Sequence, residues 1–360
     1  MPLRRGWTTG ACAAAAARAA FASLLTGAFP DPVSIRLPRG EKPSFPLALK
    51  QPGDAHARAG IIKDAGDDPD VTHGALIVAE IAWGGPGSGI VFRAGDGVGT
   101  VTRPGLPLAV GEPAINPKPR EMIAETLFDL AEANGAPPPD LIVTISIPGG
   151  ERLAEKTMNA RLGIVGGLSV LGTTGIVVPY SCASWIHAIH RGIDVARAAG
   201  LQHIAAATGS TSERAVQRAY DLPDHGLIDM GDFVGGTLKY LRGHPVPRLT
   251  LAGGFAKLAK LAAGHLDLHS SRSSVDIAAL ARLLAQTGAD EATLAAAQNA
   301  DSAAALFEIA GPRAPALAGA VARRAREVAL ATLSGHTAVE VAIVDRAGRM
   351  VANTDMHRAA

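Results

Sequence analysis

Leu141-Ile-Val-Thr-Ile-Ser-Ile147 runs directly into Pro148-Gly149-Gly150, so an apolar, β-branched stretch ends in a tight turn, and the helical stretch Glu151–Met158 follows. The same order recurs at His203–Ala207 with Thr208-Gly209, and at Leu249–Ala252 with Gly253-Gly254. Apolar strands that alternate with helices predict a mainly parallel sheet, which binds ligands at the carboxyl ends of its strands. We therefore expect an α/β domain whose three glycine turns line one sheet edge.

The region before this domain has a different hydrophobic pattern. From Val33 to Val110, short apolar runs are broken by Gly, Pro and Asp, which predicts a sheet-rich α+β region rather than βαβ units. A helix is expected over Arg120–Asn134. The triple proline of Gly135-Ala-Pro-Pro-Pro-Asp140 then predicts a linker. The 360 residues are enough for two domains, placed at 1–136 and 137–360, the second ending in C-terminal helices.

The composition limits the partners. Hydrophobic residues make up 48% of the chain, and 34 Lys and Arg nearly balance 33 Asp and Glu. Nucleic acid and anionic membranes usually select a basic excess, so we expect neither as a partner and look for local cationic clusters instead. Cys12 and Cys182 are too far apart for a zinc finger. Two reduced thiols of a cytoplasmic enzyme are the preferred interpretation, with one long-range disulfide as the alternative.

Two apolar segments resemble membrane or targeting segments. In Ala11–Leu25 the apolar run is interrupted by Arg18, preceded by the capping residues Thr8 and Thr9, and ended by Gly27, which predicts a buried or amphipathic helix. The uncharged segment Leu162–His190 is long enough to span a bilayer, but its glycines and a proline favour strand, turns and a helix start. A cytoplasmic protein is expected.

The glycine turns are candidate ligand sites, because a glycine after a strand lets the backbone approach a ligand closely. The candidate residues are Gly149, Gly150 and Glu151 in the first turn and Thr208, Gly209 and Ser210 in the second. Ser210-Thr-Ser-Glu213 is also a capping-box pattern that opens a helix. Neither turn is a Walker A loop or a complete Rossmann fingerprint, and a turn without ligand is the alternative for each.

An acidic stretch, Lys63-Asp-Ala-Gly-Asp-Asp-Pro-Asp70, lies just before His73. Its carboxylates can serve a hard cation, general acid or base chemistry, or a solvated structural turn, and the spacing departs from an EF-hand loop. Cationic residues gather after the first glycine turn, at Arg152, Lys156 and Arg161, and after the third, at Lys257. Such groups make a carboxylate or phosphate clamp, with solvated surface charge as the alternative.

Several long motifs occur in an order typical of one family. They are Gly6-Trp-Thr-Thr-Gly-Ala-Cys-Ala-Ala13, the stretch Lys63–Gly74, Gly97-Val-Gly-Thr-Val-Thr-Arg-Pro-Gly-Leu106, Val110-Gly-Glu-Pro-Ala-Ile-Asn-Pro117, Gly149–Asn159 and Arg161–Ile176. With these motifs the chain resembles the cobalt-precorrin-5B C1-methyltransferases of cobalamin biosynthesis. The resemblance is densest from residue 6 to about 220, and Ala160 stands where the family pattern leads us to expect proline.

This resemblance implies S-adenosylmethionine as methyl donor, a cobalt-containing tetrapyrrole as acceptor, and cobalt-precorrin-6A as product. Methyl transfer from a sulfonium needs mainly alignment in a dry site, so no protein-bound metal is expected. We assign donor binding to the two glycine turns, with the macrocycle in a cleft between the domains. The remaining assignments are Asp64, Asp67, Asp68 and His73 as catalytic, and Thr8, Thr9, Lys63, Arg103, Arg152, Lys156, Arg161 and Lys257 as substrate-binding.

Two other functions remain open at this stage. A non-enzymatic tetrapyrrole carrier would share the cleft and cations but would need no donor site. A nucleotide-dependent transferase of another pathway would use the same glycine turns, with a phosphate-directed lysine and carboxylates for magnesium. The partner in every case is a small molecule, and a homo-oligomer is compatible with the sequence.

Overall fold

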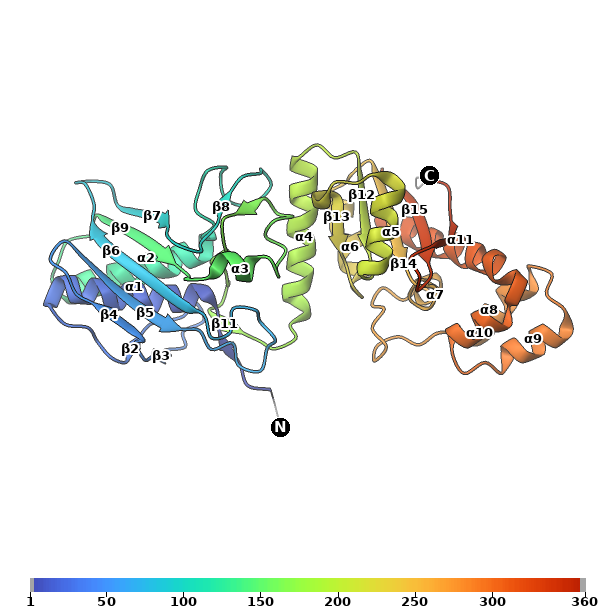
Figure 1. The fold of residues 1–360 in the computed structure, drawn as a ribbon, viewed down its shortest axis with the longest axis horizontal. Helices are drawn as coiled ribbons and strands as arrows, with labels where there is room; N and C mark the ends of the chain where they lie inside the picture. Colours follow the sequence, from blue (N-terminus) through green and yellow to red (C-terminus); the bar gives the residue numbers. More distant parts are fainter. Residues whose placement is uncertain (1–2, 357–360) are drawn as a thin grey trace. The chain divides into compact units, whose positions relative to one another are not determined.

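The computed structural model describes residues 3–356 and divides into two compact units, Met1–Ser181 (unit 1) and Cys182–Ala360 (unit 2) (Figure 1). The sheet of unit 1 has the strand order β4-β5-β6-β9-β7. Its strands are β4 (Leu49–Gln51), β5 (His56–Ile62), β6 (Leu76–Trp83), β7 (Ile90–Ala94) and β9 (Leu141–Ser146). Neighbours are antiparallel except β7 and β9, which run parallel. A sheet-rich α+β region is therefore confirmed.

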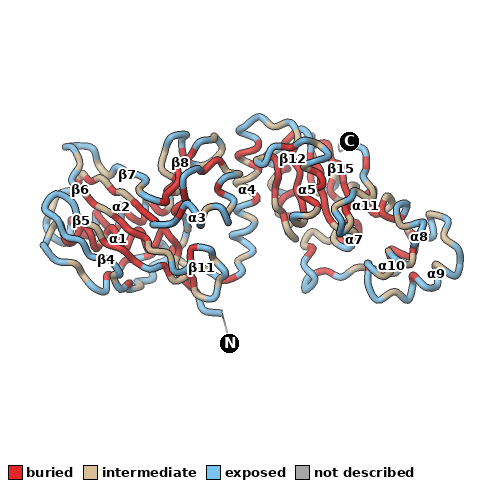
Figure 2. Tube along the Cα trace, in the orientation of Figure 1, coloured by how far each residue is buried: buried red, intermediate tan, exposed pale blue. Residues whose placement is uncertain are grey.

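Helix α1 (Thr9–Thr26) forms the centre of the unit 1 core, where it packs on β5 and β6 and beside α2 (Pro117–Ala133). Thr8 caps it by accepting a hydrogen bond from the Ala11 amide, and Gly27 ends it at φ +77°. Both ends are as expected from the sequence. By length and composition α1 is apolar enough to cross a membrane, the one such helix in residues 3–356, yet 78% of it is buried inside the structure (Figure 2).

Short pairs of strands complete unit 1 outside its main sheet. β1 (Gly6–Trp7) pairs with β11 (Ile176–Val177), and β8 (Thr100–Val101) pairs with β10 (Ile164–Val165). β2 (Val33–Ser34) pairs with β3 (Ser44–Phe45), and the five-residue helix α3 (Gly150–Ala154) follows β9. The segment Leu162–His190 is therefore strand, turns and the start of α4 (Cys182–Ala198), as expected.

The predicted domain boundary at 136/137 is wrong. Strand β9 follows the triple proline, but it pairs with β6 and β7 in the middle of the first sheet. Residues 137–139 therefore form a loop inside unit 1, between α2 and β9. The two units divide after Ser181 instead, because the apolar run Leu141–Ile147 completes the core that α1 and α2 began.

Unit 2 contains the mainly parallel sheet, in the order β13-β12-β14-β15-β16. Its strands are β12 (His203–Ala207), β13 (Leu227–Asp229), β14 (Arg248–Gly253), β15 (Ala338–Val344) and the antiparallel edge strand β16 (Met350–Asn353). Its helices include α5 (Ser210–Tyr220), α6 (Val234–Gly243), α7 (Phe255–Ala262), α8 (Ile277–Ala285), α9 (Glu291–Gln298), α10 (Ala303–Ile309) and α11 (Ala314–Leu333), with short 3-10 turns at Asp224–Gly226 and Gly311–Arg313. The predicted α/β class of this part of the chain is confirmed.

Alternation along the strands of unit 2 divides its side chains between two cores. In β12, Ile204 and Ala206 face the larger core, with α6, α7 and α11, whereas Ala205 and Ala207 face the smaller one with α5. From β12 the chain passes to β13 at one side and then to β14 at the other. This reversal makes the carboxyl ends of β12 and β14 a topological switch point, the place where open α/β sheets bind ligands.

Candidate functional site

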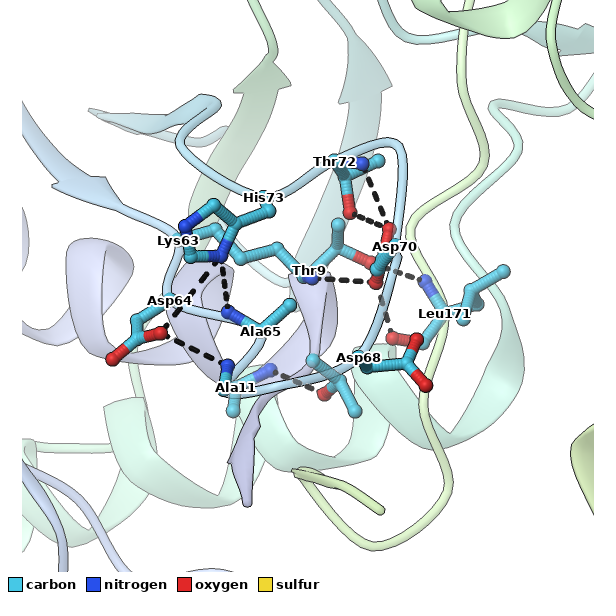
Figure 3. Close-up of polar contacts among 12 residues, drawn as sticks. Thr9, Ala11, Lys63, Asp64, Ala65, Asp68, Asp70, Thr72, His73 and Leu171 are labelled. Carbon is cyan, nitrogen blue, oxygen red and sulfur yellow. Dashed lines mark hydrogen bonds and ion pairs between the residues drawn. The ribbon is translucent and has the colours of Figure 1, made fainter. Parts of the chain in front are cut away.

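The acidic loop, residues 63–74, connects β5 to β6 and is built around an ion pair between a buried lysine and a partly buried aspartate (Figure 3). Lys63 is only 1% exposed, and its Nζ donates to Asp70 Oδ2 at 2.6 Å. The backbone and hydroxyl of Thr72 both donate to Asp70 Oδ1, at 2.8 and 2.6 Å. Burial opposes ionisation of Asp70, but the hydrogen bonds from Lys63 and Thr72 outweigh it and lower its pKa. Asp70 is therefore ionised at neutral pH and faces the Lys63 side chain as a carboxylate.

Asp64 lies at the start of the loop and is held by Arg4. The Arg4 guanidinium binds both carboxylate oxygens, and the Gly66 amide donates to Oδ1 at 2.9 Å. The Arg4 hydrogen bond, helped by Gly66, lowers the pKa of Asp64 to about 2. His73 lies beside it, and its Nδ1 accepts from the Ala65 amide at 3.1 Å. This acceptor role fixes the orientation of the imidazole ring, whose side chain is 54% exposed.

Asp67 and Asp68 join the loop to other segments of unit 1. The Arg4 backbone amide donates to Asp67 Oδ2 at 2.6 Å, and the Tyr180 amide donates to Asp68 Oδ1 at 2.9 Å. Tyr180 has φ +56°, a left-handed conformation that is rare for an aromatic residue, and it is 68% exposed. Asp68 therefore fixes a strained backbone that holds an aromatic ring at the surface.

Of the four aspartates, Asp67 and Asp68 accept the fewest hydrogen bonds within residues 3–356. Asp64 is a very weak base with its pKa near 2, and Asp70 is neutralised by Lys63. In residues 3–356, the hydrogen bonds of Asp67 and Asp68 engage one carboxylate oxygen each. The second oxygen of each can still receive a proton or a hydrogen bond.

Thr8 and Thr9 have structural partners. Both are buried, and Thr8 caps α1. Thr9 Oγ1 exchanges hydrogen bonds with the backbone of Leu171 at 3.1 and 2.9 Å (Figure 3). A Cβ at Gly172 would collide with the Thr8 side chain. These threonines tie the segment around Leu171 to α1, close to the acidic loop, and they support the site rather than line it.

The predicted cationic residues are divided between the units. Arg103, Arg152, Lys156 and Arg161 lie in unit 1, and Arg152 and Lys156 are exposed. The side chain of Arg103 packs over Gly163. Lys257 lies in unit 2, where its Nζ forms an ion pair with Asp232. The helix expected over Glu151–Met158 ends at Ala154, so Lys156 lies beyond it.

The expectation of three glycine turns on one sheet edge is also wrong. Gly149, Gly150 and Glu151 follow β9 in unit 1, whereas Thr208, Gly209 and Ser210 follow β12 in unit 2. Gly253-Gly254 shares the edge of unit 2, because β12 and β14 are parallel neighbours. Helix α5 begins at Ser210, so its N-cap is Gly209, which has no side chain, and Ser210 is not the N-cap that the predicted capping box requires.

The two sets of glycines differ in what surrounds them. A Cβ at Gly150 would fall on the Gly97 carbonyl, and Gly149 has φ +78°, so the fold itself accounts for both. Gly209 is extended, with φ 166°, and a Cβ there would meet nothing within 4 Å. Gly254 is equally open. At these two positions the fold does not need glycine, and the backbone stays accessible at the switch point.

Arg4 and Tyr180 were not predicted as site residues. Tyr180 is 112 positions from Asp68, and its backbone conformation has no signature in the sequence. Both cysteines are free, as expected, and burial raises the pKa of the Cys12 thiol to about 12. Within residues 3–356 no group of three or more His, Cys, Asp or Glu is arranged to hold a metal ion.

The parallel sheet of unit 2 makes it an open α/β unit, a class of fold that binds its ligands at the topological switch point. Residues 1–179 match the family model CbiD, and residues 267–355 match the model of the CbiD C-terminal domain. Among curated relatives, the cobalt-precorrin-5B C(1)-methyltransferase of Brucella anthropi is 58% identical and covers 97% of this chain and 95% of the relative. The enzyme of that name from Paramagnetospirillum magneticum is also 58% identical, covering 97% of each chain. The chain belongs to the CbiD family.

One solved structure is similar as well. It is the cobalamin biosynthesis protein CbiD from Archaeoglobus fulgidus, which is 30% identical and matches with a TM-score of 0.41. The match covers 75% of this chain and 83% of that one. The resemblance read from the sequence motifs is confirmed by the family models and the curated relatives.

Proposed function

We propose that this protein transfers a methyl group from S-adenosylmethionine to C-1 of cobalt-precorrin-5B, giving cobalt-precorrin-6A in cobalamin biosynthesis. The observation that carries the proposal is near full-length similarity, at 58% identity, to relatives named for this reaction. In the transfer, the electron pair of the ring carbon forms the new C–C bond while the S–CH3 bond breaks, and S-adenosylhomocysteine leaves. We expect the reaction to take place in the cytoplasm.

The donor site of this proposal is the switch point in unit 2, at Thr208, Gly209 and Ser210. A ligand can approach the backbone there because Gly209 faces open space. The alternative turn at Gly149–Glu151 is less suitable, since the Gly97 backbone crowds Gly150, Gly149 is needed for its left-handed conformation, and α3 is only five residues long. The open turn, and not the number of glycines, supports the choice.

The acceptor site of this proposal is the acidic loop with Tyr180, in unit 1. A planar conjugated macrocycle can stack on an exposed aromatic ring. Arg5 is exposed and directly precedes β1, the partner of β11, so it lies on the segment beside the one that leads to Tyr180 and can attract the acetate and propionate groups. A proton released from the macrocycle after methylation would pass to Asp67 or Asp68.

Mass spectrometry of the product is the direct test of the reaction. The purified protein, incubated with donor and cobalt-precorrin-5B, should add one methyl group and yield S-adenosylhomocysteine. A carrier would bind the tetrapyrrole and leave its mass unchanged. A nucleotide-dependent transferase would need ATP and would ignore S-adenosylmethionine. If Asp67→Asn and Asp68→Asn both turned over normally, the proton-accepting role of these carboxylates would be wrong.

Calorimetry with S-adenosylhomocysteine tests the donor site. A Val side chain at position 209 enters space that the ligand needs, so Gly209→Val should weaken binding by at least about tenfold, which corresponds to 1.4 kcal/mol. Gly149→Val is the control in the other turn and should bind as the unaltered protein does, provided that it folds. The opposite pattern would move the donor to unit 1.

A further inference from the structure

The end of β13 lies next to the proposed donor turn. Asp229 is the last residue of β13, and its register partner across the ladder is Ala207, the last residue of β12. The turn at Thr208–Ser210 and Asp229 therefore emerge side by side from the same edge of the sheet. The main chain continues this neighbourhood, because the Met230 amide donates to the Ala207 carbonyl at 3.0 Å.

The face on which Asp229 lies follows from its neighbours in β13. Leu227 packs into the smaller core with α5, and Ile228 packs into the larger core on the opposite face. Side chains alternate along a strand, so Asp229 belongs to the α5 face, together with Leu227. It is half-buried there, at the edge where α5 begins.

The position of Asp229 along the chain is informative as well. It lies twenty residues beyond Gly209 and ends the second strand of a β-turn-α-β unit. In doubly wound sheets that bind adenosine cofactors, an acidic residue about twenty positions after the glycine turn accepts hydrogen bonds from the ribose hydroxyls. The turn itself lacks the complete glycine fingerprint, but its strand order and this carboxylate agree with such a site.

We propose that Asp229 accepts hydrogen bonds from the ribose hydroxyls of the adenosine part of the methyl donor. This inference rests on the proposed function and specifies how its donor is oriented. β12 lies between β13 and β14, so a donor whose ribose is at Asp229 crosses the turn at Gly209. Its sulfonium end then points toward Gly253-Gly254, the other open glycine turn of this edge.

Trp185 offers an optical probe of the same place. The indole Nε1 donates to the Asp229 carbonyl at 3.1 Å, and the ring lies so close to Gly231 that a Cβ there would approach it to 3.4 Å. The side chain is 47% exposed. A purine bound beside Asp229 should therefore change the fluorescence of Trp185, and Trp185→Phe should remove that change.

A double-mutant cycle with altered ligand tests the proposal. Affinity for S-adenosylhomocysteine and for its 2′-deoxyribose analogue is measured by calorimetry on unaltered protein, Asp229→Asn and Asp229→Glu. We expect Asp229→Asn to weaken the natural ligand about 10- to 100-fold, as for a lost charge-assisted hydrogen bond. The analogue should lose much less from the same change, because it already lacks one hydroxyl. Asp229→Glu should recover part of the affinity.

Asp224→Asn is the matched control, because it removes a carboxylate just before the opposite end of the same strand. It should leave both affinities unchanged. Equal losses for ligand and analogue in Asp229→Asn would overturn the ribose assignment, and so would unaltered binding of both. If the unaltered protein failed to bind S-adenosylhomocysteine at all, the proposed function itself would be wrong. Thermal melts of each variant separate these outcomes from failure to fold.

Discussion

The two units contain the same local arrangement and use it differently. In unit 1, the parallel neighbours β7 and β9 end in glycine turns, and in unit 2 so do β12 and β14. The glycines of unit 1 let backbone pack on backbone: Gly97 lies against the Ile147 carbonyl, and Gly150 against Gly97. Gly209 in unit 2 faces open space. Glycine after a strand thus indicates a close approach, and only the structure shows whether protein or ligand makes it.

The largest expected effect separates these two kinds of glycine. In Gly97→Ala, the new Cβ would overlap the Ile147 carbonyl in a backbone with φ +70°, which should destabilise unit 1 by about 4 kcal/mol. Gly209→Ala should change the stability of unit 2 by less than about 0.5 kcal/mol. Hydrogen exchange read by mass spectrometry reports each unit separately. Similar losses in both variants would mean that the turns do not differ.

The next effect concerns the ion pair of the acidic loop. Asp70→Asn leaves the buried Lys63 ammonium without its counter-charge, and we expect a loss of about 3 kcal/mol in the unfolding free energy of unit 1. Asp64→Asn is the control, because its pair with Arg4 is exposed and should contribute less than about 1 kcal/mol. Urea titration followed by circular dichroism measures both. Equal losses of unfolding free energy in the two variants would contradict the idea that burial of Lys63 makes its ion pair the more important one.

Acid should act on the same carboxylates. Their folded-state pKa values are lowered, so their stabilisation is present above an unfolded pKa of about 3.9 and is lost as the pH falls through the folded values. For Asp64 this window extends from about pH 4 to about 2. The unfolding free energy of Asp70→Asn should therefore fall less between pH 4 and pH 2 than that of the unaltered protein, because one of the two carboxylates is no longer there to be protonated.

The smallest expected effect concerns Tyr180, and it tests whether the ring of this strained residue binds the macrocycle. Tyr180→Gly suits the backbone at φ +56°, so stability should stay the same or rise by up to about 1 kcal/mol. Without the ring, the KM for the macrocycle should rise by up to about tenfold, as expected for one lost stacking contact. Tyr180→Phe keeps the ring and should behave normally. Should Tyr180→Gly retain its KM, the ring would have no part in binding.

Much of the local structure could be predicted from the sequence. The apolar run His203–Ala207 is a strand with the predicted bounds, and Thr8 and Gly27 bound α1 as capping chemistry requires. The assignment of strands to sheets could not be predicted. Leu141–Ile147 is equally apolar whichever sheet it joins, so periodicity alone could not show that β9 belongs to unit 1.

In the candidate site, too, local features could be predicted from the sequence and long-range contacts could not. The acidic loop stands out by composition, and one of its ion pairs, between Lys63 and Asp70, is local. The other, between Arg4 and Asp64, joins residues 60 positions apart. The clamp between Asp68 and Tyr180 depends on a fold that brings together residues 112 positions apart. Likewise, the contrast between Gly150 and Gly209 is a matter of surrounding atoms, which a glycine in a sequence does not reveal.

The alanine-rich helix α1 has a consequence during synthesis. It ends at residue 26, but α2, one of its packing partners, is complete only at residue 133. At a translation rate of 5–20 residues per second, those hundred or so residues take roughly 5–20 s. Throughout that interval the ribosome carries an apolar N-terminal helix of membrane-like hydropathy. We therefore expect chaperones that bind exposed apolar segments to contact this part of the nascent chain until α2 and the sheet of unit 1 cover it.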